Sequence, residues 1–274
     1  MKQNASLFAL ILLVLVFGNS CKKTNENPDP EMPAAMMEPV LFNFTGTWNS
    51  VCGGILKPAL DSVRLFKPGT ILINVHMNSA GGLGTDPLSN ADSEGLARFF
   101  NVYPNSDSTY STPYTWFMVD GFIGGFNYTG ISYTAFAASI DWAKEMKTPA
   151  IALDIIPEIS GNQLNVKVRT ETVYMFSMPV FISVYITEDN LFATQADDAG
   201  SEPGVHHDVL RDCLNACNGD KIADFLDAGA KNEYSFSSIL DNSWSPNNMK
   251  VTVIVWYQDP VYGNLVHLGK QVNL

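Results

Sequence analysis

Residues 164–169 read LNVKVR, and this short stretch carries the pattern that decides the fold of the second half of the chain. Leu164, Val166 and Val168 alternate with polar residues, so every second side chain points to the same face of an extended strand. At least six strands in about 125 residues predict an antiparallel β-sandwich of the immunoglobulin-like type over residues 149–274. The segments with this character are 151–156, 164–168, 180–186, 234–239, 251–255 and 265–272.

Before Pro149 the apolar period changes from two to about 3.6 residues in several segments. In the first of them Leu56, Leu60 and Val63 lie at positions i, i+4 and i+7, which places them on one face of a helix. Strands and helices in alternation predict an α/β domain over residues 40–148, so the whole chain is expected to be α+β. The alternating segments are 40–44, 52–66, 70–77, 91–100, 114–120 and 132–146.

The composition excludes two classes of protein. The chain has 274 residues, of which 46% are hydrophobic, and this content is too high for a chain that stays disordered. Acidic residues outnumber basic residues by 28 to 16, and the formal net charge is −12. Nucleic-acid binding depends on neutralising phosphates with basic side chains, so we expect no nucleic-acid partner.

The amino terminus has the features of a signal peptide over residues 1–20. The unbroken apolar run 7–17 would span roughly 16 Å as a helix, about half of a bilayer's hydrocarbon core. The small residues before Cys21 resemble a bacterial lipoprotein cleavage box, in which the cysteine carries the lipid. Residues 21–39 are rich in proline and polar residues and predict a flexible tether. An ordinary signal peptide with an incidental cysteine is the alternative, and the membrane leaflet stays open.

The segment FTGTWNSVC (44–52) lies where the first predicted strand meets the first predicted helix. It resembles the Trp-Cys-x-x-Cys turn of thioredoxin-like proteins, with Trp48 in place and Asn49 where the first cysteine would stand. Thr112 and Pro113 precede the strand at 114–120, where thioredoxin-like folds have a cis-proline that faces the redox turn.

The mature chain as a whole is similar to the Bacteroidota outer-membrane lipoproteins named after an outer membrane protein of roughly 28 kDa. This resemblance implies a thioredoxin-like domain followed by a carboxy-terminal β-sandwich domain. The residues that carry it in the second half are SVYITEDN (183–190), HHDVLRDCLN (206–215) and SWSPNNMKVTVIVWY (243–257).

The redox-like turn has one cysteine in place of two, so it cannot carry out dithiol exchange. Asn49 cannot act as the nucleophile, and Cys52 stands in the resolving position, where a buried cysteine behaves as a small apolar side chain. Asn49 still suits the first position of a helix, because its side-chain oxygen can accept a backbone N–H two or three residues on. If the groove beside Thr112 and Pro113 persists, an extended peptide could bind there by strand addition without catalysis.

The other cysteines and a possible modification site complete the candidates. We expect a short helix over residues 205–217, which disfavours a disulfide between Cys213 and Cys217 unless residues 215–219 are non-helical. No spacing in the chain is typical of a metal site, so we expect none. Ser108 lies in a short match to the O-glycosylation signal of Bacteroidota exported proteins.

We therefore expect a lipid-anchored outer-membrane protein that acts as a binding or structural module for a protein or peptide, with no cofactor and no catalytic residue. The first alternative is an enzyme that uses Cys52, either a thiol-disulfide oxidoreductase or a monothiol that reacts with peroxide. The second alternative is a surface adhesion or assembly factor that uses the β-sandwich. The sequence leaves the partner, the leaflet and the oligomeric state undetermined.

Overall fold

The computed structural model describes residues 31–36, 38–78, 85–100, 102, 114–119, 122–127, 132–146, 149–197, 199–261 and 263–274. Met32–Leu274 form one compact unit. Strands dominate this unit, and helices are few. The strands are β1 (Val40–Thr45), β2 (Ile71–His76), β3 (Tyr114–Val119), β4 (Phe122–Asn127), β5 (Ile151–Ser160), β6 (Gln163–Thr172), β7 (Val180–Glu188), β8 (Leu191–Asp197), β9 (Gly200–His206), β10 (Val209–Cys213), β11 (Asp220–Ala223), β12 (Lys231–Ile239), β13 (Met249–Asp259) and β14 (Gly263–Asn273). The helices are α1 (Lys57–Phe66), α2 (Ala91–Phe99) and α3 (Tyr133–Met146), with a π-helical turn η1 (Cys52–Leu56) and a 3-10 turn η2 (Pro246–Asn248).

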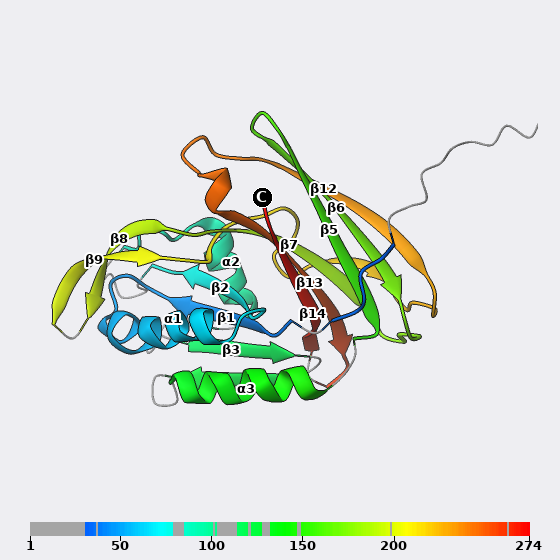
Figure 1. Cartoon of the computed structure of the whole chain (residues 1–274), viewed down its shortest axis with the longest axis horizontal. Helices are drawn as coiled ribbons and strands as arrows, with labels where there is room; N and C mark the ends of the chain where they lie inside the picture. The colour runs from blue at the N-terminus through cyan, green and yellow to red at the C-terminus, as the bar shows by residue number, and fades with distance from the viewer. Residues whose placement is uncertain are drawn as a thin grey trace, which may run out of the picture. The chain divides into compact units, whose positions relative to one another are not determined.

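One nine-stranded sheet runs through most of the unit (Figure 1). Its order is β14-β13-β7-β10-β2-β1-β3-β4, and β11 pairs with β7 beside this path. β1 is parallel to β2 and antiparallel to β3, whereas β7, β13 and β14 are antiparallel neighbours. The sheet therefore joins strands from both sides of Pro149.

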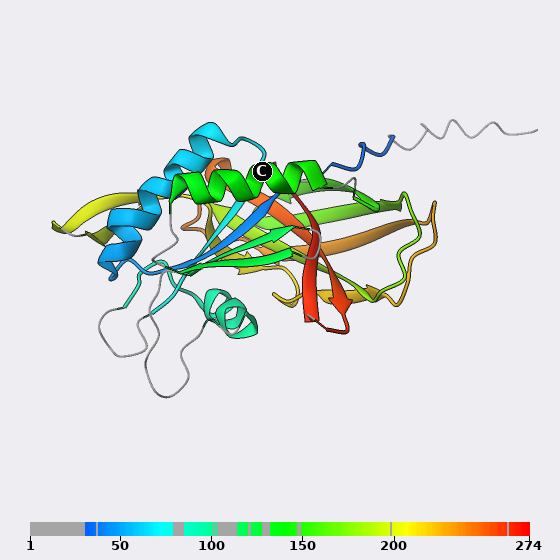
Figure 2. The same ribbon diagram turned by 90° about the horizontal axis from the view of Figure 1, so that it is seen from below.

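The helices cover the two faces of the β1–β4 part of this sheet. Figure 2 shows α1 and α3 on one face and α2 on the other. All six residues of β1 are buried, because successive side chains point to opposite faces and both faces are covered. Leu41 packs with the buried sides of α1 and α3, and Phe42 and Phe44 face the cluster that contains Leu96 of α2.

The sheet curls, so that strands far apart in its order pack against one another. The ring of Phe42 on β1 stacks on the ring of Trp256 on β13, with centroids 5.8 Å apart. The Tyr185 ring of β7 meets the same Phe42 ring edge-on at 6.1 Å. This aromatic cluster forms the core between α2 and the curled sheet.

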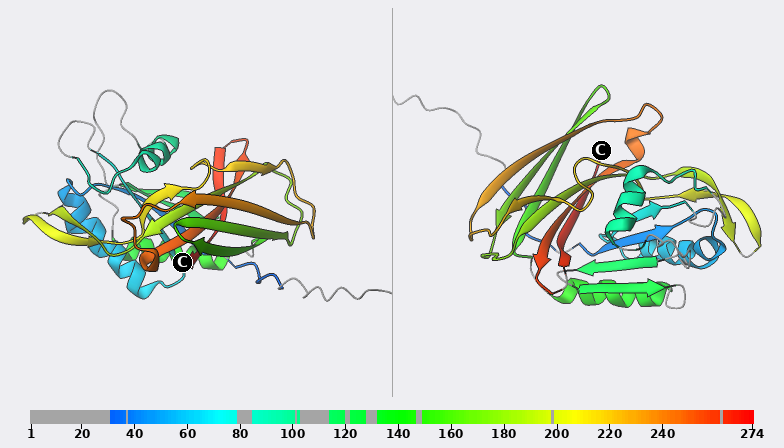
Figure 3. Two further views of the ribbon diagram at one scale, coloured as in Figure 1. Left: turned by 90° about the horizontal axis from the view of Figure 1, so that it is seen from above. Right: turned by 180° about the vertical axis from the view of Figure 1, so that it is seen from behind.

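A second layer covers the outer face of the β7–β13–β14 part. The three-stranded sheet β12-β6-β5 packs its apolar face against β7, β13 and β14 and encloses the largest apolar core. Leu164, Val166 and Val168, whose alternation indicated a strand, all lie in this core. The β8–β9 hairpin forms a separate two-stranded sheet at the end of the unit away from β5, β6 and β12 (Figure 3).

The predicted fold class is wrong. The sequence favoured a thioredoxin-like α/β domain followed by a separate immunoglobulin-like sandwich, but the structure is mostly β, with its main sheet continuous across both halves. The individual strands and helices before Pro149 do occur near their predicted positions. The prediction failed because local periods locate elements and carry no information on which strands pair across a long separation.

The predicted helix over residues 205–217 is also wrong, and this error hid the element that joins the two halves. Residues 209–213 form β10, which lies between β7 and β2. Val209 and Leu210 are both fully buried, because the sheet is covered on both faces at this point. A short strand buried on both sides has no apolar-polar alternation, so its sequence did not distinguish it from a helix.

The turn before β10 is held by an ion cluster centred on Asp208, whose side chain is 5% exposed. One carboxylate oxygen of Asp208 accepts from Lys250 Nζ at 2.5 Å, and the other pairs with Arg64 at 2.6 Å. Lys250 also binds Asp189 at 2.7 Å. The cluster thus ties α1, the β7–β8 turn, the β9–β10 turn and β13 together.

Each charged group of the cluster stabilises the ionised form of its partner. Burial alone would raise the pKa of Asp189, but its hydrogen bonds from Lys250 and from the Asp208 backbone hold it below the usual value. Burial alone would lower the pKa of Lys250, and the Asp208 and Asp189 carboxylates raise it instead. Asp208 itself has a positive φ of 50°. Aspartate and asparagine tolerate this conformation better than most residues.

We predict that Asp208→Asn lowers the free energy of unfolding by about 3 kcal/mol, because it removes the buried carboxylate that Lys250 and Arg64 share. Asparagine keeps the size and the backbone conformation, so the loss reports the charge. Asp61→Asn is the matched control, since Asp61 pairs with the same Arg64 but is 43% exposed, and we expect a change within about 0.5 kcal/mol. Urea unfolding measures both variants. Equal small losses would contradict a structural role for Asp208.

Candidate functional site

The turn that resembles a redox motif is fixed by its own hydrogen bonds. The side-chain oxygen of Asn49 accepts the N–H groups of Val51 at 2.9 Å and of Cys52 at 3.3 Å. This contact is the one predicted for an asparagine at the start of a helix. The indole N–H of Trp48 donates to the Met77 carbonyl at 2.9 Å, which fixes the turn to the end of β2.

The β8–β9 hairpin closes over this turn. The Ala196 N–H donates to the Thr47 carbonyl at 2.8 Å, and the side-chain amide of Gln195 lies 3.2 Å from the carbonyl oxygens of both Thr47 and Asn49. Backbone groups of the turn that an extended peptide would use are therefore taken by the chain's own strand β8.

Gly53 allows this close approach. A Cβ atom placed on Gly53 would lie 2.1 Å from the Ala196 carbonyl oxygen and 2.8 Å from Cγ of Gln195. Real Cβ atoms do not approach other atoms so closely, so only glycine fits beneath β8 at this position. The turn and the hairpin are therefore complementary in shape at Gly53.

Cys52 lies beneath the closed turn. Its exposed fraction is 2%, and it is a free cysteine. It lines a narrow pocket of about 30 Å³, together with side chains from β2, α1 and β9. The thiol is thus in the recessed, shielded place that the sequence predicted for it.

Two buried histidines line the same pocket. His76 Nδ1 lies 2.8 Å from the Asp86 carboxylate, which also accepts the Thr47 N–H at 2.8 Å. Burial alone would raise the pKa of Asp86, but the contacts with His76 and the backbone hold it below its usual value. A lowered carboxyl pKa stabilises the fold above the range where an unfolded aspartate titrates, and this contribution is lost as the pH falls through the folded value. Burial and the neighbouring His76 lower the pKa of His206 to about 4, so His206 is neutral at pH 7.

Several predicted site residues lie outside the described residues. They are the lipidation candidate Cys21, the glycosylation candidate Ser108, and Thr112 and Pro113 of the predicted peptide groove, together with the signal peptide over residues 1–20. These predictions stay predictions.

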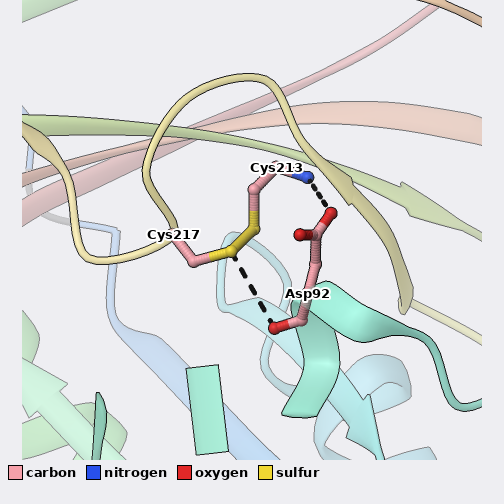
Figure 4. Close-up of side chains that lie close together, drawn as sticks. All are labelled: Asp92, Cys213 and Cys217. Carbon is pink, nitrogen blue, oxygen red and sulfur yellow. Dashed lines mark hydrogen bonds between the residues drawn. A yellow bond between two sulfur atoms is a disulfide. The ribbon is translucent and has the colours of Figure 1, made fainter. Parts of the chain in front are cut away.

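Cys213 and Cys217 form a disulfide, contrary to the expectation from a helix (Figure 4). Their Cα atoms lie 5.4 Å apart, within the range that a disulfide requires. The bond is possible because β10 ends at Cys213 and the chain then turns, which is the non-helical arrangement that the spacing argument left open. In the described part of the chain, three potential metal ligands meet only where Asp92 joins these two cysteines. The disulfide removes both thiolates as ligands.

Sequence reasoning missed three residues that shape this region, namely Gln195, Asp86 and Asp208. Each acts across a long separation, since Gln195 bonds to a residue 148 positions away and Asp208 to one 144 positions away. Asp86 follows β2 by ten positions and precedes the Pro87 and Asn90 turn, a place typical of a side chain that satisfies backbone N–H groups. Only this local signal was present in the sequence.

A family model described as outer membrane protein Omp28 matches residues 127–266, just over half of the chain. The chain belongs to the Omp28 family. Membership assigns it to a family of outer membrane proteins, as the resemblance of residues 183–190, 206–215 and 243–257 indicated. Those three segments of the Omp28-family chain supply most of the ion cluster, because they contain Asp189, Asp208 and Lys250.

Two solved structures share the fold of this Omp28-family protein. HBP35 of Porphyromonas gingivalis aligns with a TM-score of 0.65 and 13% identity, over 88% of this chain and 77% of that one. Protein AGR_C_4864 from Agrobacterium tumefaciens aligns with a TM-score of 0.52 and 11% identity, over 87% of this chain and 95% of that one. At such low identity these matches concern the fold alone. No curated protein matches the sequence.

Among the helices of the described residues, none is both long enough and apolar enough to cross a bilayer.

We predict that Gly53→Ala lowers the free energy of unfolding by about 2 kcal/mol, because the added methyl group pushes against the Ala196 carbonyl and forces β8 away from the turn. Gly95→Ala is the control. Gly95 lies within α2, and a Cβ atom placed there would have nothing within 4 Å, so alanine should raise the stability by about 0.5 to 1 kcal/mol. Chemical denaturation measures both. An unchanged stability for Gly53→Ala would show that the hairpin does not press on the turn.

Proposed function

We propose that the chain is a lipid-anchored protein of the outer membrane that binds a protein or peptide partner, without redox chemistry at the Trp48–Cys52 turn and without a cofactor. Membership of the Omp28 family supports the place in the outer membrane. Cys21 would carry the lipid, and residues 21–39 would form the tether. The facing of the protein toward the periplasm or the cell surface is left open.

The observation that carries the non-catalytic role is the closed turn. Asn49 replaces the nucleophile, and Cys52 is 2% exposed beneath Gln195 and Ala196. Thiol exchange needs a thiolate that a second sulfur can reach along the line of the bond. The turn is held by hydrogen bonds on both sides, so no small movement of one side chain would expose Cys52.

The β8–β9 hairpin supports a binding role. Its two strands pair with each other and with no other strand in the described ranges. Ala196 of β8 bonds to the Thr47 carbonyl, whereas β9 leaves an outer edge. Phe192 on β8 is 79% exposed, which is unusual for a large apolar side chain in a strand. An unpaired edge beside an exposed aromatic ring offers a partner both backbone hydrogen bonds and an apolar contact.

Two other functions keep a specific observation in their favour. Chemistry at Cys52, with a small oxidant, is favoured by the pocket that this thiol shares with His76 and His206. An adhesion or assembly role for residues 149–274 is favoured by exposed apolar side chains on the loops after β6 and β11. These side chains are Val173, Tyr174, Met175 and Phe225.

Alkylation of Cys52 separates the binding role from the enzyme. We predict that iodoacetamide labels Cys52 in the native protein at least roughly 100-fold more slowly than in urea, because labelling requires the hairpin to open. Peptide mass analysis gives both rates, and Cys52→Ala, which removes the site, is the control for labelling elsewhere. Rapid labelling of the native protein, or insulin reduction at the rate of a dithiol enzyme, would favour the alternative of an enzyme that uses Cys52.

Cell fractionation tests the anchor and the partner on one sample. We predict that Cys21→Ala moves the protein from the membrane fraction to the soluble fraction, because the acyl chains supply the membrane affinity. In the anchored protein, crosslinking should capture a partner that Phe192→Ser loses, while Phe66→Ser on the exposed end of α1 keeps it. Unchanged fractionation would contradict the anchor. Equal capture by both phenylalanine variants would place the partner elsewhere than the hairpin.

A further inference from the structure

The disulfide between Cys213 and Cys217 lies at the carboxyl end of β10, against the first turn of α2 (Figure 4). Both cysteines are partly exposed, and the neighbours of Cys217, Ala216 and Asn218, are exposed. Asp92 of α2 contacts both halves of the bond. Its carboxylate accepts the Cys213 N–H at 2.9 Å, and its carbonyl oxygen lies 3.8 Å from Cys217 Sγ.

The loop that carries the disulfide is held in place by other contacts. Asn215 accepts the Val184 N–H at 2.9 Å and donates to the Ile182 carbonyl at 2.7 Å, so it binds β7 as another strand would. The Cys217 carbonyl accepts from the hydroxyl groups of Ser183 and Tyr185. These contacts hold the loop on β7 in addition to the sulfur–sulfur bond.

A pair of carboxyl groups lies beside the same bond. Asp212 interacts with Asp92 and accepts from Ser238 Oγ at 2.6 Å. Burial and the neighbouring Asp92 carboxyl raise the pKa of Asp212, so Asp212 retains its proton at a higher pH than an exposed aspartate would. Asp212 directly precedes Cys213 in the chain, and Asp92 bonds to the Cys213 backbone. The Asp92 carboxyl group of this pair lies within 4.8 Å of Cys213 Sγ, so a proton source is close to one sulfur of the disulfide.

We propose that Cys213 and Cys217 form a reversible redox site that exchanges with a dithiol, in which the Asp92–Asp212 pair supplies a proton to the Cys213 thiolate. This site is separate from Cys52, and it does not rest on the binding role. Because the surrounding contacts remain, the protein keeps its fold in both redox states.

The direction of the exchange follows from the exposed neighbours of Cys217, Ala216 and Asn218. A thiolate of the dithiol attacks Sγ of Cys217 and forms an intermolecular disulfide while the Cys213–Cys217 bond breaks. Cys213 leaves as a thiolate and takes the proton of the carboxyl pair, which regains a proton from solvent. The second thiolate of the dithiol then attacks the dithiol sulfur that is bound to Cys217, which closes a disulfide within the dithiol and breaks the intermolecular bond. Cys217 leaves as a thiolate and is protonated by solvent. Two electrons and two protons pass from the dithiol to the protein.

Reduction of the full protein by dithiothreitol tests whether the bond is accessible. We expect two additional thiols in native conditions at pH 7, counted by alkylation and mass, with a fall in Tm of less than about 5 °C. Release of these thiols only in urea, or together with unfolding, would overturn the proposal. The double variant Cys213→Ser and Cys217→Ser should gain no thiols when dithiothreitol is added.

The pH dependence of the reduction rate tests the carboxyl pair. We expect Asp212→Asn to slow reduction at least tenfold at pH 7 and to flatten the rate profile in the range where the pair titrates. Asp220→Asn is the matched control, because Asp220 is exposed three residues beyond Cys217. Both variants should unfold at nearly the wild-type temperature. Equal rates for the two variants would overturn the proton transfer.

Discussion

The structure depends on the placement of β10 between β7 and β2. The Asn74 N–H of β2 donates to the Asp208 carbonyl at 2.8 Å, and the Asn74 side chain donates to the His207 carbonyl at 2.6 Å. Without these bonds the main sheet would separate into two smaller sheets, each with an open edge that invites aggregation. The charges of Asp208, Asp189 and Lys250 surround the same junction, so one short turn carries both the backbone pairing and the ion pairs that join the two halves of the chain.

The sequence predicts well those elements whose burial is one-sided. η1 and α1 show their buried face in Leu56, Leu60 and Val63, and β6 shows it in the alternation of Leu164 with Asn165. The sequence does not predict β10, because Val209 and Leu210 are buried on opposite faces and show no apolar-polar alternation. The predicted fold class was wrong for the same reason, because a domain boundary inferred from a change of period cannot reveal a strand that bridges the boundary.

The candidate site shows the same division between local and distant causes. The contacts of Asn49 with Val51 and Cys52 are local, and helix-capping rules predict them from the sequence. The closure by Gln195 is not local, and a glutamine in a strand has no pattern that indicates a partner 146 residues away. The same holds for the disulfide, because the bond between Cys213 and Cys217 depends on residues 209–213 forming β10 and not the predicted helix. Asn49 carries no thiol, and the hairpin covers Cys52, so a local feature and a distant one both shape the turn.

The distance along the chain between the redox-like turn and its cover sets an order of events during folding. Thr47 meets Gln195 across 148 residues, and contacts of such long range form late. Until the hairpin docks, Cys52 stays open in an envelope compartment where disulfides form readily. Cys213 and Cys217 follow the hairpin closely and are close together in the chain, so they find each other faster than either finds Cys52. The close spacing of Cys213 and Cys217 therefore protects Cys52 from a mispaired disulfide until the β8–β9 hairpin has covered it.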